Sequence, residues 1–407
     1  MYTIYVKNIG KWCIKLKTSM YSKSFALFLS PIAIIFRIFG FRFVQSFDVN
    51  RIGHLILDLL YLDLRSRNDK LFGTRFILFI PNGITVNSYA LEKLPKKFIV
   101  IKNVFLCKLF SLFKLNIFCG INPRESTWIP YQAATFYKYT HLINSSQPFF
   151  SDLPSRNNDL FLKLLEDLGI SNNRWYICLH NREDGYTKNK IPDVNSDFRN
   201  GSINNFISTI NFISNLGGAV VRMGDSSMTP FPNIPGLADY AHSPLKSEMN
   251  DILLSANCRF FLGNTSGAHQ MASSQGIPVV GVNLAAMGFC KFWSPNDIGV
   301  PKLYLKEGTN EPIPFKEIFH SKLANFYQTQ MFSEAGVYLN ETPEDEIIEA
   351  VKQMIDQLNG KFQESPIDRE LQYKFNSLFN ITNYSFYSQT KISSYFLRKH
   401  KDLLLEY

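Results

Sequence analysis

The chain has 407 residues, of which 45% are apolar and 19% are charged. That length exceeds one ordinary hydrophobic core, so we expect two domains with extensions, and the composition excludes a disordered or collagen-like chain. The net charge is +9, and residues 1–47 supply most of it because they hold seven Lys and Arg and no acidic residue. The remaining sequence is nearly neutral and has no basic stripe, which argues against a nucleic-acid partner.

The six cysteines and seven histidines are scattered along the sequence. No C-x-x-C pair occurs, and several cysteines lie in apolar runs, as Cys178 and Cys258 do. This pattern is typical of buried thiols in a reducing compartment and not of a disulfide framework or a zinc site. We therefore predict no metal site.

The N-terminal segment, residues 1–45, is basic and contains the apolar run FALFLSPIAIIF at 25–36. That run is too short to cross a bilayer, and no small-residue cleavage site follows it as in a secretory signal. We expect a cationic, amphipathic segment on the anionic inner face of the cytoplasmic membrane, which makes the protein cytoplasmic and peripheral. The alternative is an N-terminal helix packed on the fold.

The next region, residues 46–150, is predicted to be an α/β domain on the acceptor side. Apolar patterns predict a strand at 41–47, a helix at 54–64, a strand at 76–80, a helix at 90–97 and a strand at 104–113. His54 follows Gly53 at the first strand-to-helix turn, where it is a candidate base or an ordinary capping histidine. A Ser-, Asn- and Pro-rich stretch at 145–158 is predicted to be a linker.

A second α/β series fills residues 171–360. Predicted strands lie at 175–179, 219–223, 237–240, 260–262 and 279–282, and predicted helices at 204–216, 247–256 and, after a capping box at Thr342, up to about 358. Residues 361–407 are predicted to be a helical tail. The expected fold class is α/β, with two Rossmann-like domains that face a cleft.

The most informative stretch is the strand–turn–helix–strand pattern at 260–283. The turn residues Gly263, Asn264, Thr265, Ser266 and Gly267 precede a helix predicted at 268–274. Free N–H groups and the positive end of a helix form an anion site at the carboxyl edge of a parallel sheet. A phosphate or diphosphate is therefore the expected ligand.

Two common nucleotide motifs do not occur. The chain has no G-x-G-x-x-G fingerprint and no G-x-x-x-x-G-K-[ST] loop. These omissions argue against a dinucleotide oxidoreductase and a P-loop kinase.

Charged residues follow the strand at 175–179. Arg182 is suited to a bidentate contact with phosphate, while His180, Glu183 and Asp184 are candidates for a general base. The alternative is a solvated loop in which these charges pair with each other.

Other polar residues stand at comparable positions along the second series. Arg199 precedes a predicted helix, and Arg222, Gly224 and Asp225 end a predicted strand. For Arg222 and Asp225, ligand binding and ordinary structural pairing both remain open.

Several of these motifs together resemble a bacterial family of surface-polysaccharide glycosyltransferases with GT-B-like architecture. The resemblance rests on HNREDGY at 180–186, RN at 199–200, GGAVVRMGD at 217–225, the stretch 239–283 and, in the first half, RIGHL at 51–55. It implies transfer of a sugar from a nucleotide-activated donor to a surface glycan or glycolipid. In related members an H-x-R segment or a T/S-x-G helix start contacts the donor diphosphate. His269 stands where the wider family more often has an apolar residue.

The resemblance and the residues together define a predicted site. The leaving diphosphate needs N–H donors and positive charge, which replace a divalent metal here, since no D-x-D triplet occurs. The nucleotide sugar is the substrate, and no cofactor is predicted. The candidate base is Asp184, then Glu183, then His54, and an inverting reaction is preferred. The candidate donor-binding residues are His180, Arg182, Arg199, Arg222, Gly224, Asp225, Asn264, Thr265, Ser266, Gly267 and His269.

Two other functions fit the same pattern. One is a sugar-nucleotide epimerase of the same architecture, which also breaks a nucleotide–sugar bond. The other is a non-catalytic polysaccharide assembly factor that binds through its basic N-terminus. The many charged residues at strand ends argue against an inactive site.

Overall fold

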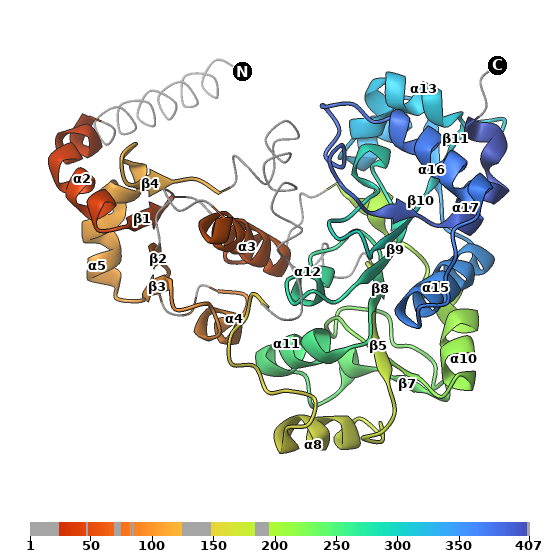
Figure 1. The fold of residues 1–407 in the computed structure, drawn as a ribbon, viewed down its shortest axis with the longest axis horizontal. Helices are drawn as coiled ribbons and strands as arrows, with labels where there is room; N and C mark the ends of the chain where they lie inside the picture. The colour runs from red at the N-terminus through yellow and green to blue at the C-terminus, as the bar shows by residue number, and fades with distance from the viewer. Residues whose placement is uncertain are drawn as a thin grey trace, which may run out of the picture. The chain divides into compact units, whose positions relative to one another are not determined.

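The computed structural model describes residues 24–45, 48–68, 75–81, 83, 85–123, 148–183 and 195–404. The chain divides into two compact units, Met1–Thr127 and Trp128–Tyr407. Each unit has its own parallel sheet (Figure 1). The α/β fold class is therefore confirmed, while the cleft between two domains and the residue ranges of the four predicted regions stay predictions.

The first unit is built on a four-stranded sheet of order β3-β2-β1-β4, in which every described pair of strands is parallel. Its elements are α2 (Ser30–Ile38), β1 (Phe41–Val44), α3 (Ile52–Asn68), β2 (Arg75–Phe79), α4 (Ser88–Glu92), β3 (Phe98–Ile101), α5 (Val104–Leu109), the 3₁₀ helix η1 (Phe110–Leu115) and β4 (Gly120–Ile121).

One face of this sheet is covered by α2 and η1. Ala33 of α2, Phe43 of β1, Phe113 of η1 and Cys119 form a buried cluster. The Phe43 ring lies 5.4 Å from that of Phe113, within the range of favourable aromatic contacts. Helix α3 lies on the other face (Figure 1).

The strand predicted at 104–113 is wrong, because this segment is helical and the strand is β3, just before it. The Asn103 side chain accepts a hydrogen bond from the Leu106 N–H at 3.1 Å, which caps the start of α5. The β-branched residues Ile99, Val100 and Ile101 occupy the strand instead, as their stiff side chains favour.

The second unit contains a seven-stranded parallel sheet of order β13-β10-β9-β8-β5-β6-β7. Its strands are β5 (Tyr176–His180), β6 (Ala219–Arg222), β7 (Leu237–Ala238), β8 (Phe261–Gly263), β9 (Val279–Leu284), β10 (Ile298–Pro301) and β13 (Lys391–Ile392). A separate antiparallel pair consists of β11 (Leu303–Lys306) and β12 (Val337–Asn340).

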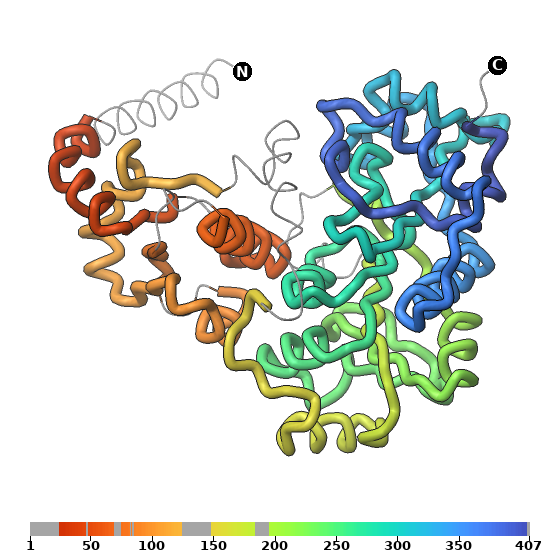
Figure 2. The backbone as a smooth tube through the Cα atoms, in the orientation of Figure 1, coloured from red at the N-terminus to blue at the C-terminus, as the bar shows by residue number. Residues whose placement is uncertain are grey.

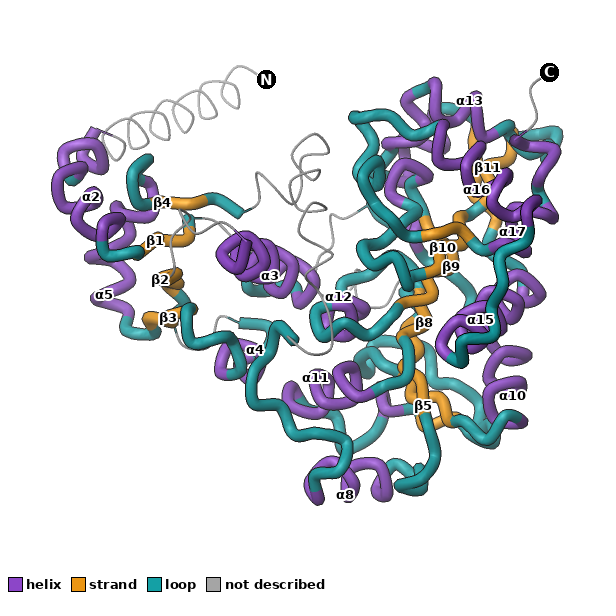
Figure 3. Tube along the Cα trace, in the orientation of Figure 1, coloured by secondary structure: helices purple, strands orange, loops and turns teal. Residues whose placement is uncertain are grey.

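Helices cover both faces of this sheet, with α10 and α15 on one side and α11 and α12 on the other (Figure 3). The α-helices are α8 (Asp159–Asp167), α10 (Ile207–Asn215), α11 (Glu248–Asn257), α12 (His269–Ser273), α13 (Phe315–His320), α14 (Thr329–Glu334), α15 (Glu344–Leu358), α16 (Pro366–Ser377) and α17 (Ser394–Lys399). The 3₁₀ helices are η3 (Asp197–Arg199), η4 (Ile203–Phe206), η5 (Tyr240–His242), η6 (Met287–Phe289), η7 (Lys322–Asn325) and η8 (Lys401–Leu404).

The C-terminal residues are part of the second unit (Figure 2). They form α16 and α17, in agreement with the predicted helical tail. They also form β13, which pairs with β10 at the edge of the sheet. Residues 148–158 pack on this unit as well, since Phe149 and Phe150 are buried.

The capping box predicted at Thr342 is wrong, although α15 itself ends at Leu358 as expected. The Thr342 hydroxyl accepts from the Asn283 N–H at 2.9 Å, and the Thr342 N–H donates to Asn283 Oδ1 at 2.7 Å. Thr342 therefore joins α15 to the end of β9 instead of capping its own helix.

Among the described helices, none combines the length and the apolar character needed to cross a bilayer.

Candidate functional site

The order of strands in the second unit determines where a ligand site is expected. From β5 the chain moves to β6 and β7 on one side, and it then returns to β8, β9 and β10 on the other side of β5. In open parallel sheets, ligands bind outside the carboxyl ends of the strands at such a reversal. Here that point lies where β5 and β8 end, which brings His180 and Arg182 next to Asn264 and Thr265.

The two central strands approach each other closely at this edge. A Cβ atom on Gly263 would lie 2.5 Å from the His180 carbonyl oxygen, so only glycine fits at the end of β8. The predicted turn therefore begins at a residue where any side chain would clash with the neighbouring strand.

The side chain of Asn264 connects three backbone segments. Its Oδ1 accepts from the Arg182 N–H at 2.8 Å, and its Nδ2 donates to Asn181 Oδ1 at 3.2 Å and to the Arg199 carbonyl at 3.1 Å. Asn264 is only 1% exposed. Asn264 was predicted to bind the sugar donor. In the structure its buried side chain instead holds together the segment after β5, the loop near 199 and the turn after β8.

The turn after β8 contains unused hydrogen-bond donors. Among the described residues, the backbone N–H groups of Thr265, Ser266, Gly267 and Ala268 meet no hydrogen-bond acceptor. The Ser266 hydroxyl is buried and also lacks a partner in the described part of the chain. Successive N–H groups without acceptors in the protein are able to donate hydrogen bonds to an anion.

The other hydroxyl of the turn supports its shape. Thr265 Oγ1 donates to the Ala285 carbonyl, which follows β9, at 3.4 Å. Helix α12 begins only at His269, so the turn is one residue longer than the sequence predicts.

Two predicted donor-binding histidines are neutral in this fold. Burial lowers the pKa of His180, and the His180 Nδ1–H donates to the Met223 carbonyl at 3.1 Å, which leaves Nε2 as the acceptor of the ring. Burial, together with the nearby His180, lowers the pKa of His269 to about 3. The His269 ring stacks on Phe292 with centroids 4.3 Å apart. His269 is therefore a packed core histidine.

Arg222 and Glu183 pair with each other instead of remaining available to a ligand. Arg222 is fully buried, and its Nη2 donates to Glu183 Oε1 at 2.9 Å while its Nη1 donates to Asp239 Oδ2 at 3.2 Å. The second Glu183 oxygen accepts from the Thr229 N–H at 2.8 Å. Of the two readings left open by the sequence, the geometry favours structural pairing for Arg222, and it weakens Glu183 as a base.

Arg182 remains at the edge of the predicted anion site. It is half-buried, and its Nη2 donates to Ser196 Oγ at 2.6 Å. Arg199 lies in η3, with its guanidinium 5.6 Å from the centroid of the Phe198 ring. Asp184, the first candidate base, lies outside the described residues, so its role stays a prediction.

Gly224 and Asp225 shape the turn after β6. A Cβ atom on Gly224 would overlap the Met228 sulfur, and the φ angle of Gly224 is +152°. Asp225 Oδ1 accepts from the Ser227 N–H at 2.9 Å, an arrangement typical of an Asx turn. These contacts give both residues a structural role at the carboxyl edge.

His54 belongs to the first unit. It lies in the first turn of α3, the helix that follows β1. Because β2 and β3 lie on one side of β1 and β4 on the other, the first sheet also reverses at β1. His54 therefore lies beside the carboxyl edge expected to bind a ligand in its own unit, and its role as a base stays a prediction.

Sequence reasoning missed Lys302, which follows β10 at the same edge as the candidate site. The side chain is 3% exposed, and its Nζ donates to the Asn200 carbonyl at 2.6 Å. Burial lowers the pKa of Lys302 to about 8, against the opposing effect of Glu341. The signal was a lysine directly after an apolar strand, the same signal that identified Arg182.

Within the described ranges, no group of three or more His, Cys, Asp or Glu side chains is arranged to hold a metal ion. The cysteines described by the structure are free thiols, and all of them except Cys107 are buried.

Comparisons with known proteins give only distant likenesses. No protein-family model matches the chain, and no curated protein matches it. A glycosyl transferase family 9 structure from Veillonella parvula matches at 13% identity over 78% of this chain and 98% of that one, with a TM-score of 0.44.

Two Escherichia coli structures match at similar distance. Heptosyltransferase WaaC with ADP has 10% identity over 78% of this chain and 97% of its own, with a TM-score of 0.37. ADP-heptose LPS heptosyltransferase II has 13% identity over 59% and 83%, with a TM-score of 0.35. Likenesses at this level carry no argument about the activity of this chain.

The buried His269 predicts a loss of stability in acid. The unfolded chain takes up a proton at this residue near pH 6.5, whereas the folded state does so only near pH 3. Protonation therefore favours unfolding as the pH falls below about 6.5, by about 2 kcal/mol at pH 5. Between pH 7.5 and 5.0, the free energy of unfolding should fall by about 2 kcal/mol less in His269→Gln than in the wild type, as measured by urea denaturation.

The constant cost of the substitution cancels in this comparison between two pH values. His320→Gln, at an exposed site that ends α13, provides the reference for removing a surface histidine. Equal losses in the wild type and in His269→Gln would contradict the assignment of His269 as a neutral core residue.

Proposed function

We propose that this chain is a glycosyltransferase that moves a sugar from a nucleotide diphosphate donor to a surface glycan or glycolipid acceptor. One observation carries the proposal. Four successive backbone N–H groups, from Thr265 to Ala268, meet no acceptor among the described residues, and they lie at the sheet reversal beside Arg182. A diphosphate has the charge and the oxygen spacing to accept from several of these groups at once.

The proposed reaction breaks the bond between the anomeric carbon of the sugar and the diphosphate oxygen. The diphosphate leaves with the electron pair, and the N–H groups after β8 stabilise the charge that develops on it. Arg182 adds a guanidinium contact. No metal ion is required in this scheme, because fixed donors and one cation face the leaving group.

The new bond forms between the acceptor hydroxyl oxygen and the anomeric carbon, and a base takes the hydroxyl proton. Glu183 is held by Arg222 and by the Thr229 N–H, so Asp184 is the better candidate of the two adjacent carboxylates. A single displacement needs one base and inverts the anomeric centre, and we propose this course.

In this proposal, binding of the nucleotide sugar is coupled to protonation of the His180 ring. With its Nδ1–H on the Met223 carbonyl, the neutral ring offers only an acceptor at Nε2. A contact between Nε2 and a phosphate oxygen therefore requires the uptake of one proton. An anion at this position raises the pKa of His180 and so favours that uptake.

The first experiment is a thermal-shift screen against nucleotides and nucleotide sugars, with and without a chelator. We expect one nucleoside diphosphate family to raise the melting temperature, and we expect the chelator to leave that increase unchanged. Incubation of the stabilising nucleotide sugar with and without glycan acceptors then separates transfer from epimerisation. Binding without turnover would favour the assembly-factor alternative, and no binding to any nucleotide would contradict the proposal.

A charge placed in the turn tests the anion site directly. Ser266→Glu introduces a carboxylate where the proposed diphosphate binds, so repulsion should lower nucleoside diphosphate affinity at least tenfold. Ser266→Gln has almost the same size without the charge, and it should retain clearly more affinity. Isothermal titration calorimetry with the nucleotide from the screen measures the affinity of both variants. Equal affinities of the two variants would show that no anion binds at this turn.

Removal of the guanidinium tests Arg182. Arg182→Ala should weaken nucleoside diphosphate binding by about 2 kcal/mol, or roughly thirtyfold, because a charge-assisted hydrogen bond is lost. Arg259→Ala is the matched control, since Arg259 precedes β8 at the opposite edge of the sheet and stacks 4.7 Å from the Trp175 ring. Unchanged affinity in Arg182→Ala would remove this residue from the site.

A further inference from the structure

The first unit has an unusually apolar outer surface along residues 24–39, which include α2 and the helical residues just before it. Ala26 and Ala33 face inward and are buried. The exposed large apolar side chains of this surface, each exposed by 40% or more, are Phe25, Leu27, Phe28, Ile32, Ile34, Ile35, Ile38 and Phe39, and the other exposed residues are Ser24, Pro31 and Arg37. A surface helix of a water-soluble domain normally turns polar residues outward, and this helix does the opposite.

A second segment adds to the same surface. The Asn116 Nδ2 donates to the Ala26 carbonyl at 2.5 Å, and the Phe36 ring lies 5.5 Å from that of Phe113, so η1 and the turn after it lie beside α2. Helix α5 leads directly into η1, and none of its residues is buried. The exposed apolar residues of this second segment are Val104, Phe105, Leu109, Leu115 and Ile117.

The two segments together form one patch, which we name the α2–α5 surface. Single exposed apolar residues are ordinary, but a contiguous set of this size marks an interaction site. Phe28 is 79% exposed and Phe105 is 71% exposed, so these rings are largely uncovered by the fold of the unit.

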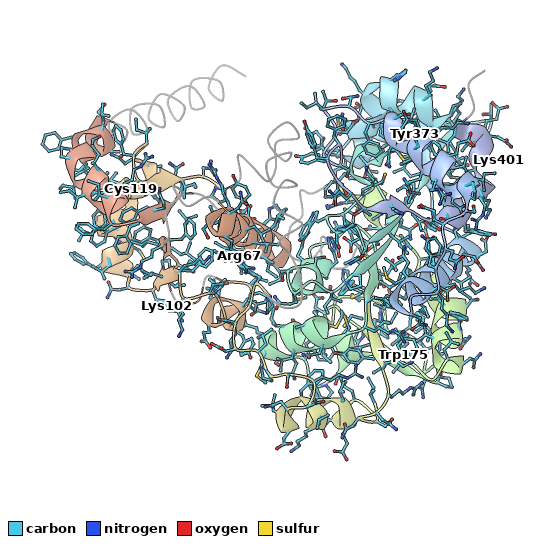
Figure 4. The ribbon with its side chains drawn as sticks, in the orientation of Figure 1. Arg67, Lys102, Cys119, Trp175, Tyr373 and Lys401 are labelled. Carbon is cyan, nitrogen blue, oxygen red and sulfur yellow. The ribbon has the colours of Figure 1, made fainter. Side chains whose placement is uncertain are left out.

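The charge of the α2–α5 surface indicates what covers it. Neither residues 24–45 nor residues 93–123 contain a single Asp or Glu. Arg37, Lys102 and Lys108 are all exposed in these two segments, and Figure 4 shows Lys102 at the amino end of α5. Large apolar side chains in segments whose only charged residues are cationic match a bilayer with anionic headgroups.

We propose that the α2–α5 surface docks on an anionic phospholipid bilayer, with the apolar side chains of both segments entering the interface. The sequence pointed only to residues 1–45, whereas the structure adds α5 and η1 from a different part of the chain. This inference goes beyond the proposed sugar transfer and does not depend on it.

The test uses the full chain and flotation with phosphatidylcholine vesicles, with and without phosphatidylglycerol. We expect binding to the anionic vesicles that weakens at high salt. Ile35→Glu combined with Phe105→Glu should lower that binding at least tenfold, because two carboxylates replace apolar groups that are already 53% and 71% exposed. Residues 1–23 keep their five lysines in this variant, so a loss of binding is attributable to the α2–α5 surface.

Tyr373→Glu is the matched control, since Tyr373 is 76% exposed on α16 of the second unit, and it should bind vesicles like the wild type. Circular dichroism confirms that the variants fold, and an unchanged thermal shift with the donor nucleotide separates this proposal from the catalytic one. Equal vesicle binding by the double variant would overturn the proposal. Absent vesicle binding, with a wild-type oligomer that the double variant dissociates, would assign the surface to a second copy of the chain.

Discussion

The candidate site depends on one buried side-chain amide. Asn264 uses its oxygen and its nitrogen to bind two other segments, Asn181–Arg182 and the loop at Arg199, which are 65 to 83 residues away in the sequence. A buried polar group left without a partner costs about 1–3 kcal/mol, so the segments after β5 and β8 have one favourable arrangement. That arrangement leaves the N–H groups from Thr265 to Ala268 at the sheet edge without acceptors of their own.

The charged residues near this edge fall into two groups. The fully buried Arg222 forms ion pairs with the half-buried Glu183 and Asp239, and Lys302 donates to a loop carbonyl, so these charges are used within the fold. Breaking one member of such a set costs several kcal/mol, which explains why they are structural. The candidate anion site is the group of backbone donors from Thr265 to Ala268, and Arg182 lies at its edge. Fixed backbone donors need no reorganisation when charge develops, which suits the loss of a diphosphate.

Five strands of the second unit, β5 to β9, were predictable because each is an apolar run that ends at glycine or at a polar residue, as β5 does at His180 and β8 at Gly263, whereas the strands from β10 to β13 were not predicted. The region of the site was predictable for the same reason, since parallel strands end at one edge. The pairing of Arg222 with Glu183 was not, because its partners are 39 residues apart. The segment at 104–113 was misread because its apolar spacing suits a strand or a helix until Asn103 is seen to cap it.

The loop held by Asn264 contains the dipeptide Asn200–Gly201, a sequence prone to backbone cyclisation and deamidation in a flexible chain. That reaction requires the Gly201 nitrogen to swing onto the Asn200 side-chain carbon. In the folded state the Gly201 N–H donates to the Arg182 carbonyl at 3.2 Å, while Asn264 and Lys302 hold the carbonyls of Arg199 and Asn200. The hydrogen bonds that shape the site therefore also protect Asn200 from deamidation, and this protection ends when the second unit unfolds.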